Sequence, residues 1–328
     1  VKVDLIFTNL TYDASQPLLS SATNRMMSEG TAKHSALELA DLVDYYGAFY
    51  STEESADYCS VNLFTLNKHL AKTLPTLREI LTEAIFPVSD LATFVLNNQQ
   101  RLIVANEKVN SIARNKFNEI IFGTDHPYGH ISTKEDYKAL NRDSLRDYHR
   151  RQYVSEHCTI IVSGKISNTT LKQINEHFGD KGWSKSNGQA PLIPAVKTNP
   201  ERKYREAKEG AIQSAIRIGK KMFTRSHEDY PGMAVLNTLF GGYFGSRLMS
   251  NIREDKGYTY GIGSAVVSMR DHGYFFISTE VGSNVADAAL EETYKEMDLL
   301  RTELVDTEEL ETVRNYMLGS FIKNLETA

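Results

Sequence analysis

The chain has 328 residues, of which 41% are hydrophobic and 24% are charged, the balance of a globular protein with room for two domains. Its formal net charge is −5 and no block of like charges occurs, so neither nucleic acid nor an anionic membrane surface is an expected partner. No apolar run approaches the roughly 18 residues that a membrane-spanning helix needs, so no membrane span is expected. Cys59 and Cys158 lie in apolar stretches typical of strands, and we interpret both as buried, unpaired thiols.

The first half of the chain reads as a strand, two helices, a hairpin and further helices. The opening strand covers residues 3–7, and a helical stretch then runs from Pro17 to Gly30. Alternation of side chains predicts a hairpin over residues 48–65. The remaining predicted elements are a helix between Leu39 and Gly47, a helix from about Lys68 that is kinked or restarted at Pro75, a helix from Asp90 to about Ile121, a helix over 142–152, a strand over 157–164 and a helix over 168–178.

A stretch rich in Ser, Gly and Pro separates the two halves of the chain. It runs from Gly182 to Pro200 and carries no helical or strand period. We therefore expect one domain over residues 1–190 and a second over residues 200–328.

The second half repeats the order of landmarks found in the first half. The run Gly257-Tyr258-Thr259-Tyr260 matches residues 47–50 at an offset of 210, and Pro231 opens a helix as Pro17 does. Matches at an offset of 216 then follow in order: Tyr274 with Tyr58, Leu290 with Leu74, and Met297 with Leu81. The sequence predicts a duplicated domain whose second copy is incomplete at its C-terminal end. The expected fold is α+β: two similar domains, each a mostly antiparallel sheet with helices packed on one face.

Three short markers in this order give the chain a family resemblance. They are Gly30-Thr31, His126-Pro127-Tyr128-Gly129 and Gly257-Tyr258-Thr259-Tyr260. With the duplication, they resemble the pitrilysin and mitochondrial-processing-peptidase family of zinc metallopeptidases over nearly the whole chain. Active members of that family carry an inverted HxxEH motif, which supplies two zinc ligands and a general base, and a later Glu that completes the site.

The resemblance places the zinc motif on residues that cannot hold zinc. Counting back from Gly30-Thr31, Ser21 and Arg25 occupy the two histidine positions and Asn24 replaces the base. Of the family's later pair of glutamates, Gln100 replaces the first and Glu107 keeps the ligand position. One carboxylate beside a permanently charged arginine does not bind a dication, so we expect no metal, no cofactor and no catalytic residue in this chain.

Two other motifs are interpreted as structural. His126 and His130 are four residues apart, but Pro127 and Gly129 between them indicate a loop rather than a helical metal site. The glycine-rich run over residues 241–245 follows a helical stretch and lacks Lys-Ser/Thr, so we interpret it as a connection and not as a phosphate loop.

Arg253 and Tyr260 are the predicted substrate-binding residues. Their spacing of seven resembles the family's arginine–tyrosine segment, which reaches the bound peptide near the zinc. A guanidinium can bind a peptide carbonyl, and a tyrosine hydroxyl can stabilise the oxyanion that forms at the scissile bond. The alternative for this pair is an arginine at a helix end and a sheet tyrosine that only pack.

These observations leave two functional hypotheses. The first is a non-catalytic, substrate-binding subunit of a two-subunit zinc metallopeptidase, paired with a zinc-bearing homologous subunit and acting on peptides or unfolded segments. The second is a structural or peptide-binding homologue without any role in proteolysis. An autonomous zinc peptidase is disfavoured by the residues at positions 21, 24, 25 and 100.

Overall fold

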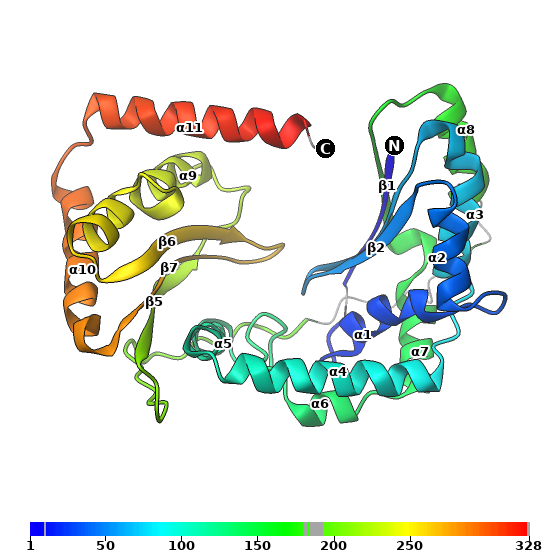
Figure 1. Cartoon of the computed structure of the whole chain (residues 1–328), viewed down its shortest axis with the longest axis horizontal. Coiled ribbons are helices and arrows are strands. Elements are labelled where there is room, and N and C mark those ends of the chain that lie inside the picture. The colour runs from blue at the N-terminus through cyan, green and yellow to red at the C-terminus, as the bar shows by residue number, and fades with distance from the viewer. Residues whose placement is uncertain (10, 180–182, 184–192, 327–328) are drawn as a thin grey trace. The chain divides into compact units, whose positions relative to one another are not determined.

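The computed structural model describes residues 1–9, 11–179, 183 and 193–326, and most of the predicted loop over 182–200 lies outside these residues. The chain divides into two compact units (Figure 1). The first unit comprises residues 1–103 and 124–196, and the second comprises residues 104–123 and 197–328. Both combine helices with an antiparallel sheet, which confirms the predicted α+β class.

The sheet of the first unit has four antiparallel strands in the order β2-β3-β1-β4. Their bounds are Lys2–Thr8 (β1), Phe49–Glu54 (β2), Tyr58–Phe64 (β3) and Cys158–Ser163 (β4). Alternate residues of the central strands enter the core: Leu5 pairs with Val61, and both side chains are fully buried. The predicted hairpin and the predicted strand over 157–164 are thus confirmed.

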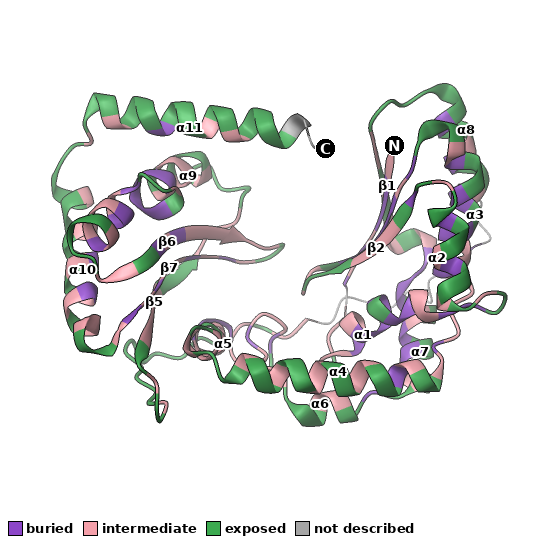
Figure 2. Ribbon diagram, in the orientation of Figure 1, coloured by how far each residue is buried: buried purple, intermediate pink, exposed green. Residues whose placement is uncertain are grey.

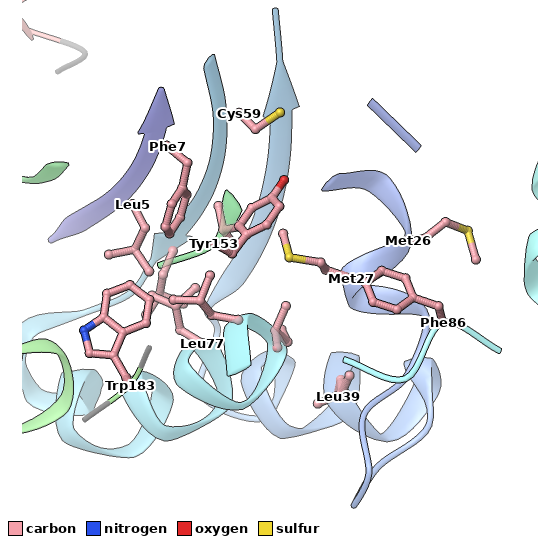
Figure 3. Close-up of a cluster of buried hydrophobic side chains, with 14 of the residues drawn as sticks. Leu5, Phe7, Met26, Met27, Leu39, Cys59, Leu77, Phe86, Tyr153 and Trp183 are labelled. Carbon is pink, nitrogen blue, oxygen red and sulfur yellow. The ribbon is translucent and has the colours of Figure 1, made fainter. Parts of the chain in front are cut away.

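Helices cover one face of this sheet and close its core. They are α1 (Leu19–Met26), α2 (Ala36–Asp44), α3 (Leu70–Thr82), α4 (Val88–Asn106), α6 (Lys134–Lys138), α7 (Arg142–Gln152) and α8 (Asn168–Phe178). Figure 3 shows Phe7 from β1 among side chains from these helices, with Tyr153 and Trp183 close to it. Trp183 is buried, meets the Phe7 ring edge-on at 6.2 Å, and donates its indole N–H to the carbonyl of Phe178 at 3.1 Å.

One helical prediction is wrong, and for another helix one of the two predicted alternatives is excluded. The stretch expected as one helix from Asp90 to Ile121 forms two helices, α4 and α5 (Val109–Phe122). The break falls at Lys108, whose extended backbone (φ −93°, ψ 120°) begins α5 as its N-cap. Apolar periodicity continues on both sides, and neither Gly nor Pro marks the break, so the sequence gives no signal for it. In α3, Pro75 lies inside one helix, and no restart occurs there.

The sheet of the second unit has three antiparallel strands in the order β5-β7-β6. Their bounds are Gln213–Met222 (β5), Thr259–Ser268 (β6) and Gly273–Gly282 (β7). Figure 2 shows the burial of these strands, and along β7 buried and partly buried residues alternate. The core face of β7 carries Phe275, Ile277 and Val281, and this core also includes Leu248 and Ile252.

The helices of the second unit are α5, α9 (Tyr230–Asn237), α10 (Ala286–Thr302) and α11 (Thr307–Glu326), with π-helical turns over Thr238–Gly242 and Met249–Asp255. Among the described residues, no helix combines the length and apolar content needed to cross a membrane.

The second sheet repeats the strand order of the first. In each sheet, the second strand of the hairpin (β3 or β7) lies between the first strand of the hairpin (β2 or β6) and the opening strand of the unit (β1 or β5). Gly47 and Gly257 both have positive φ (62° and 65°), and each stands two residues before its strand. A left-handed backbone favours glycine at these two turns, which supports the proposed duplication.

Candidate functional site

The position of the family's general base is occupied by a buried amide. Asn24 on α1 is 1% exposed, and its Nδ2 donates to the carbonyl of Glu53 at 2.7 Å and to that of Ser60 at 3.4 Å. The hydroxyl of Tyr153 donates to Asn24 Oδ1 at 3.0 Å. Asn24 therefore ties α1 to β2, β3 and the residue after α7, and its amide is engaged in packing rather than open to a substrate.

The two histidine positions also carry local structural roles. The Ser21 hydroxyl donates to the carbonyl of Leu18, one turn back, at 3.1 Å. Arg25 is exposed. Burial raises the pKa of Glu54, and the charge of Arg25 opposes that rise. A cation that stabilises a neighbouring carboxylate does not leave room for a metal ion in the same place.

Gln100 and Glu107 do not supply a ligand set. Gln100 is exposed on α4, in the first unit. Glu107 lies in the turn after α4 and belongs to the second unit, where its carboxylate pairs with the ammonium of Lys208 at 2.8 Å. Across the described ranges, no group of three or more His, Cys, Asp or Glu side chains could hold a metal ion. The residues at the family's metal positions thus do not fit zinc.

The paired histidines lie in a loop, as predicted. The backbone N–H groups of Gly129 and His130 both donate to the carbonyl of His126, which closes a turn over these residues. The His130 ring lies 3.0 Å from a carboxylate oxygen of Asp136, while His126 Nδ1 accepts from the backbone N–H of Tyr128 at 3.1 Å. The two rings therefore serve separate local contacts.

Arg253 lies near the end of the π-helical turn over Met249–Asp255. Its guanidinium carbon is 4.5 Å from the centroid of the Phe244 ring, and one of its nitrogens is 3.7 Å from the carboxylate of Glu254. Phe244 is 64% exposed. The ring supports one face of the guanidinium by a cation–π contact, and the Glu254 carboxylate lies beside one of its nitrogens.

Tyr260 lies on a β-bulge near the start of β6. Thr259 pairs with Val281 and Ile262 pairs with Thr279, so Tyr260 and Gly261 together stand opposite Glu280. The extra residue bends the strand locally and changes the direction of its side chains. Tyr260 is 96% exposed, which makes it the most exposed tyrosine among the large apolar side chains described.

Two threonine hydroxyls hold this bulge. The Thr259 hydroxyl donates to the carbonyl of Glu280 at 2.7 Å and accepts from the N–H of Gly261 at 3.1 Å. The Thr279 hydroxyl donates to the carbonyl of Gly261 at 3.0 Å. These bonds replace the backbone hydrogen bonds that the bulge removes, so they stabilise the strand in the conformation that exposes Tyr260.

The sequence did not reveal Phe244 or the bulge. Phe244 belongs to the glycine-rich run that was interpreted as a connection, and its role depends on a contact across a turn. Gly261, directly after Tyr260, is the one available signal, since an isolated glycine in a strand often marks a bulge.

Comparison with known proteins gives consistent matches. A family model described as the peptidase M16 inactive domain matches residues 139–317. The chain is 26% identical over 311 residues to the "Uncharacterized zinc protease YmxG" of Bacillus subtilis, covering 94% of this chain and 75% of that protein. It is 20% identical over 313 residues to the "Non-peptidase homolog YmxG" of Helicobacter pylori, covering 94% and 71%. A peptidase M16 inactive domain from Pseudomonas fluorescens has the same fold, with a TM-score of 0.84 and 21% identity over 98% of this chain and 78% of that one.

Proposed function

We propose that this chain, which belongs to the peptidase M16 family, is the substrate-binding subunit of a two-subunit zinc metallopeptidase. Membership in this family is what the order of sequence markers predicted. The match is to the family's inactive domain, and the chain is accordingly a non-catalytic peptidase homologue. Its role as a subunit, its partner and its peptide substrate belong to the proposal.

The state of the first unit supports a role without catalysis. A general base must reach the proton that it removes, but the Asn24 amide is buried and bonded to two strand carbonyls and to Tyr153. An amide also has no basic lone pair of useful strength at neutral pH. We therefore expect the chain alone to cleave no peptide and to bind no zinc at α1.

The second unit supports a role in substrate binding, and the exposure of Tyr260 is the observation that carries it. Tyr260 is 96% exposed on a bulge held by two threonines, so its side chain is open to a ligand that approaches from outside the core of this unit. Arg253 is in the same unit, and the backbone N–H of Tyr258 donates to the carbonyl of Ile252 at 3.0 Å, which joins the two segments. A peptide carbonyl would accept from Arg253, and a developing oxyanion would accept from the Tyr260 hydroxyl.

The partner in this proposal is a homologous subunit that keeps the HxxEH motif and carries the zinc. It would supply the metal, the activated water and the base, while this chain would supply donors to the peptide. A homologue without any role in proteolysis is the outcome to be distinguished from this one.

The test is the turnover of a complex formed with a zinc-bearing homologue. Tyr260→Phe should leave assembly unchanged and lower peptide cleavage by a factor on the order of 10²–10³, the usual loss for one oxyanion donor. Arg253→Ala should also weaken peptide binding. Tyr294→Phe is the matched control, because this tyrosine of α10 is 47% exposed in the same unit and should leave turnover unchanged. Normal cleavage by a properly assembled Tyr260→Phe complex would reject the catalytic contribution and favour the non-proteolytic homologue.

A further inference from the structure

Arg217 lies on the face of the second sheet that is turned away from the core. Its neighbours on β5, Ile216 and Ile218, pack against the core cluster, so the side chain between them points to the opposite face. Helix α5 packs on that face through Phe117, which is 8% exposed. At Gly219 an added Cβ would stand 2.7 Å from the Phe117 ring, and the absence of a side chain there lets α5 approach closely.

The guanidinium of Arg217 lies against two aromatic rings and, within the described part of the chain, has no acidic partner. Its central carbon is 4.1 Å from the centroid of Phe276 and 5.2 Å from that of Phe117. Its Nε is buried without a hydrogen-bond acceptor, and Arg217 forms no ion pair with any residue that the structure describes. Glu280, which pairs with Ala215 and thus lies diagonally from Arg217, is not bonded to it either.

The surroundings add positive charge rather than neutralise it. Arg114 is exposed on α5, one turn before Phe117. Burial lowers the pKa of Arg217, the nearby Tyr274 opposes that change, and the charge of Arg114 adds to the lowering. A partly buried cation without a counter-ion is costly to the fold, and a bound anion would offset that cost.

We propose that Arg217, assisted by Arg114, binds a carboxylate of an extended peptide, either an acidic side chain or a C-terminal carboxylate. Stacking on rings covers the flat faces of a guanidinium and leaves its N–H edge, which matches a carboxylate. Tyr260 and Arg217 lie on the two outer strands of one sheet: Tyr260 on β6 stands opposite Glu280 of β7, and Glu280 pairs with Ala215 of β5, two residues from Arg217. The inference rests on the proposed function and gives it a substrate class.

The test is the binding of matched peptides to the full chain, measured by fluorescence anisotropy. The probes are a short unstructured peptide with amide-capped C-terminus and one central Glu, the same peptide with Gln, and the Gln peptide with a free C-terminal carboxylate. The wild-type chain should bind at least one carboxylate peptide roughly tenfold more tightly than the capped Gln peptide, the effect of one charge-assisted hydrogen bond. Tighter binding of the Glu peptide would identify an acidic side chain as the ligand, and tighter binding of the peptide with a free C-terminus would identify the C-terminal carboxylate.

Arg217→Met should abolish this preference while leaving the melting temperature unchanged or higher, since it removes an unpaired cation. Arg225→Met is the matched control: it removes the same charge from an arginine 5.8 Å from the Tyr230 ring in the same unit, and the preference should persist. Equal binding of all three peptides, or a preference that survives in Arg217→Met, would overturn the carboxylate site alone. Binding of none of them would overturn the proposed peptide-binding function together with it.

Discussion

Tyr50 and Tyr260 occupy corresponding places in the two units but have opposite environments. Each is the second residue of the first hairpin strand, three residues after a glycine with positive φ. Tyr50 sits in the regular β2–β3 ladder opposite Leu63 and packs against the first core. Burial raises its pKa, and the charge of Glu29 adds to the rise. Tyr260 stands on the bulge of β6 and is almost completely exposed.

The difference shows that a repeated strand order can hold two corresponding tyrosines in different environments. The first unit has an unbroken hairpin, and Asn24 uses its amide for hydrogen bonds within that unit. The second unit interrupts the equivalent hairpin by one extra residue, and the tyrosine at that place is exposed instead of packed. If the first unit has a structural role and the bulge keeps Tyr260 exposed, substitutions in the two units should have different effects.

The largest effect is expected when the base position is restored. Asn24→Glu should lower the free energy of unfolding by about 4 kcal/mol, because it places a carboxylate against the carbonyls of Glu53 and Ser60 and removes their donor. Asn97→Glu, the same change at an exposed position of α4, should stay within about 0.5 kcal/mol. Urea unfolding measures both. Wild-type stability of Asn24→Glu would mean that α1 still accommodates a carboxylate, and the structural reading of Asn24 would fail.

An intermediate effect is expected from acid, and it should be confined to the first unit. Burial lowers the pKa of His149 to about 4, outweighing the hydrogen bond to the carbonyl of Leu81 at 2.8 Å, and Arg150 lowers it further. The unfolded chain binds this proton near its ordinary pKa of about 6.5, so stability is full above that value and falls as the pH drops toward about 4. We expect a loss of about 2 kcal/mol, less than the full shift implies, because the ring remains partly exposed to solvent.

The control for this prediction is His149→Gln, which keeps a side-chain amide near the Leu81 carbonyl and does not titrate. Its stability should change less between neutral and acidic pH than that of the wild type, as followed by thermal unfolding. An identical pH profile for both proteins would assign the acid sensitivity to other groups.

The smallest effect concerns the bulge itself. Thr279→Val removes the donor to the carbonyl of Gly261 and should destabilise the chain by about 1 kcal/mol. It should also slow nitration of Tyr260 by tetranitromethane relative to Tyr50, measured by mass spectrometry, since the bulge no longer holds the ring in solvent. Thr293→Val removes a buried hydroxyl bonded only within α10, and it should leave nitration of Tyr260 unchanged. Unchanged nitration in Thr279→Val would mean that the bulge does not depend on this hydroxyl.

Periodic sequence patterns predicted the regular elements, and non-periodic features escaped prediction. Alternation located the β2–β3 hairpin, and helical spacing located α2, α7 and α8, because one face of each meets a core. The break at Lys108 was missed, since the apolar pattern continues across it and no Gly or Pro marks the extended backbone there. Glu107, which was assigned to a ligand position by its spacing from Gln100, lies in the turn at this break.

The sequence could indicate which residues belong to the candidate site but not what those residues contact. Spacing to a family motif selected Arg253 and Tyr260, and nothing in the spacing indicated that one residue stacks on Phe244 or that the other stands on a bulge. Arg217 carried no sequence signal at all: an arginine in a strand is unremarkable until Phe117, from a helix about one hundred residues earlier, is found beside it.

The single tryptophan of the chain is Trp183, and its burial in the first core has a spectroscopic consequence. Its emission reports the loosening of the first unit through the contacts with Phe7 and Phe178. Melting of the second unit changes no indole environment, so it should register in circular dichroism but be silent in tryptophan fluorescence. A difference between the two unfolding curves therefore separates the stabilities of the two halves without cutting the chain.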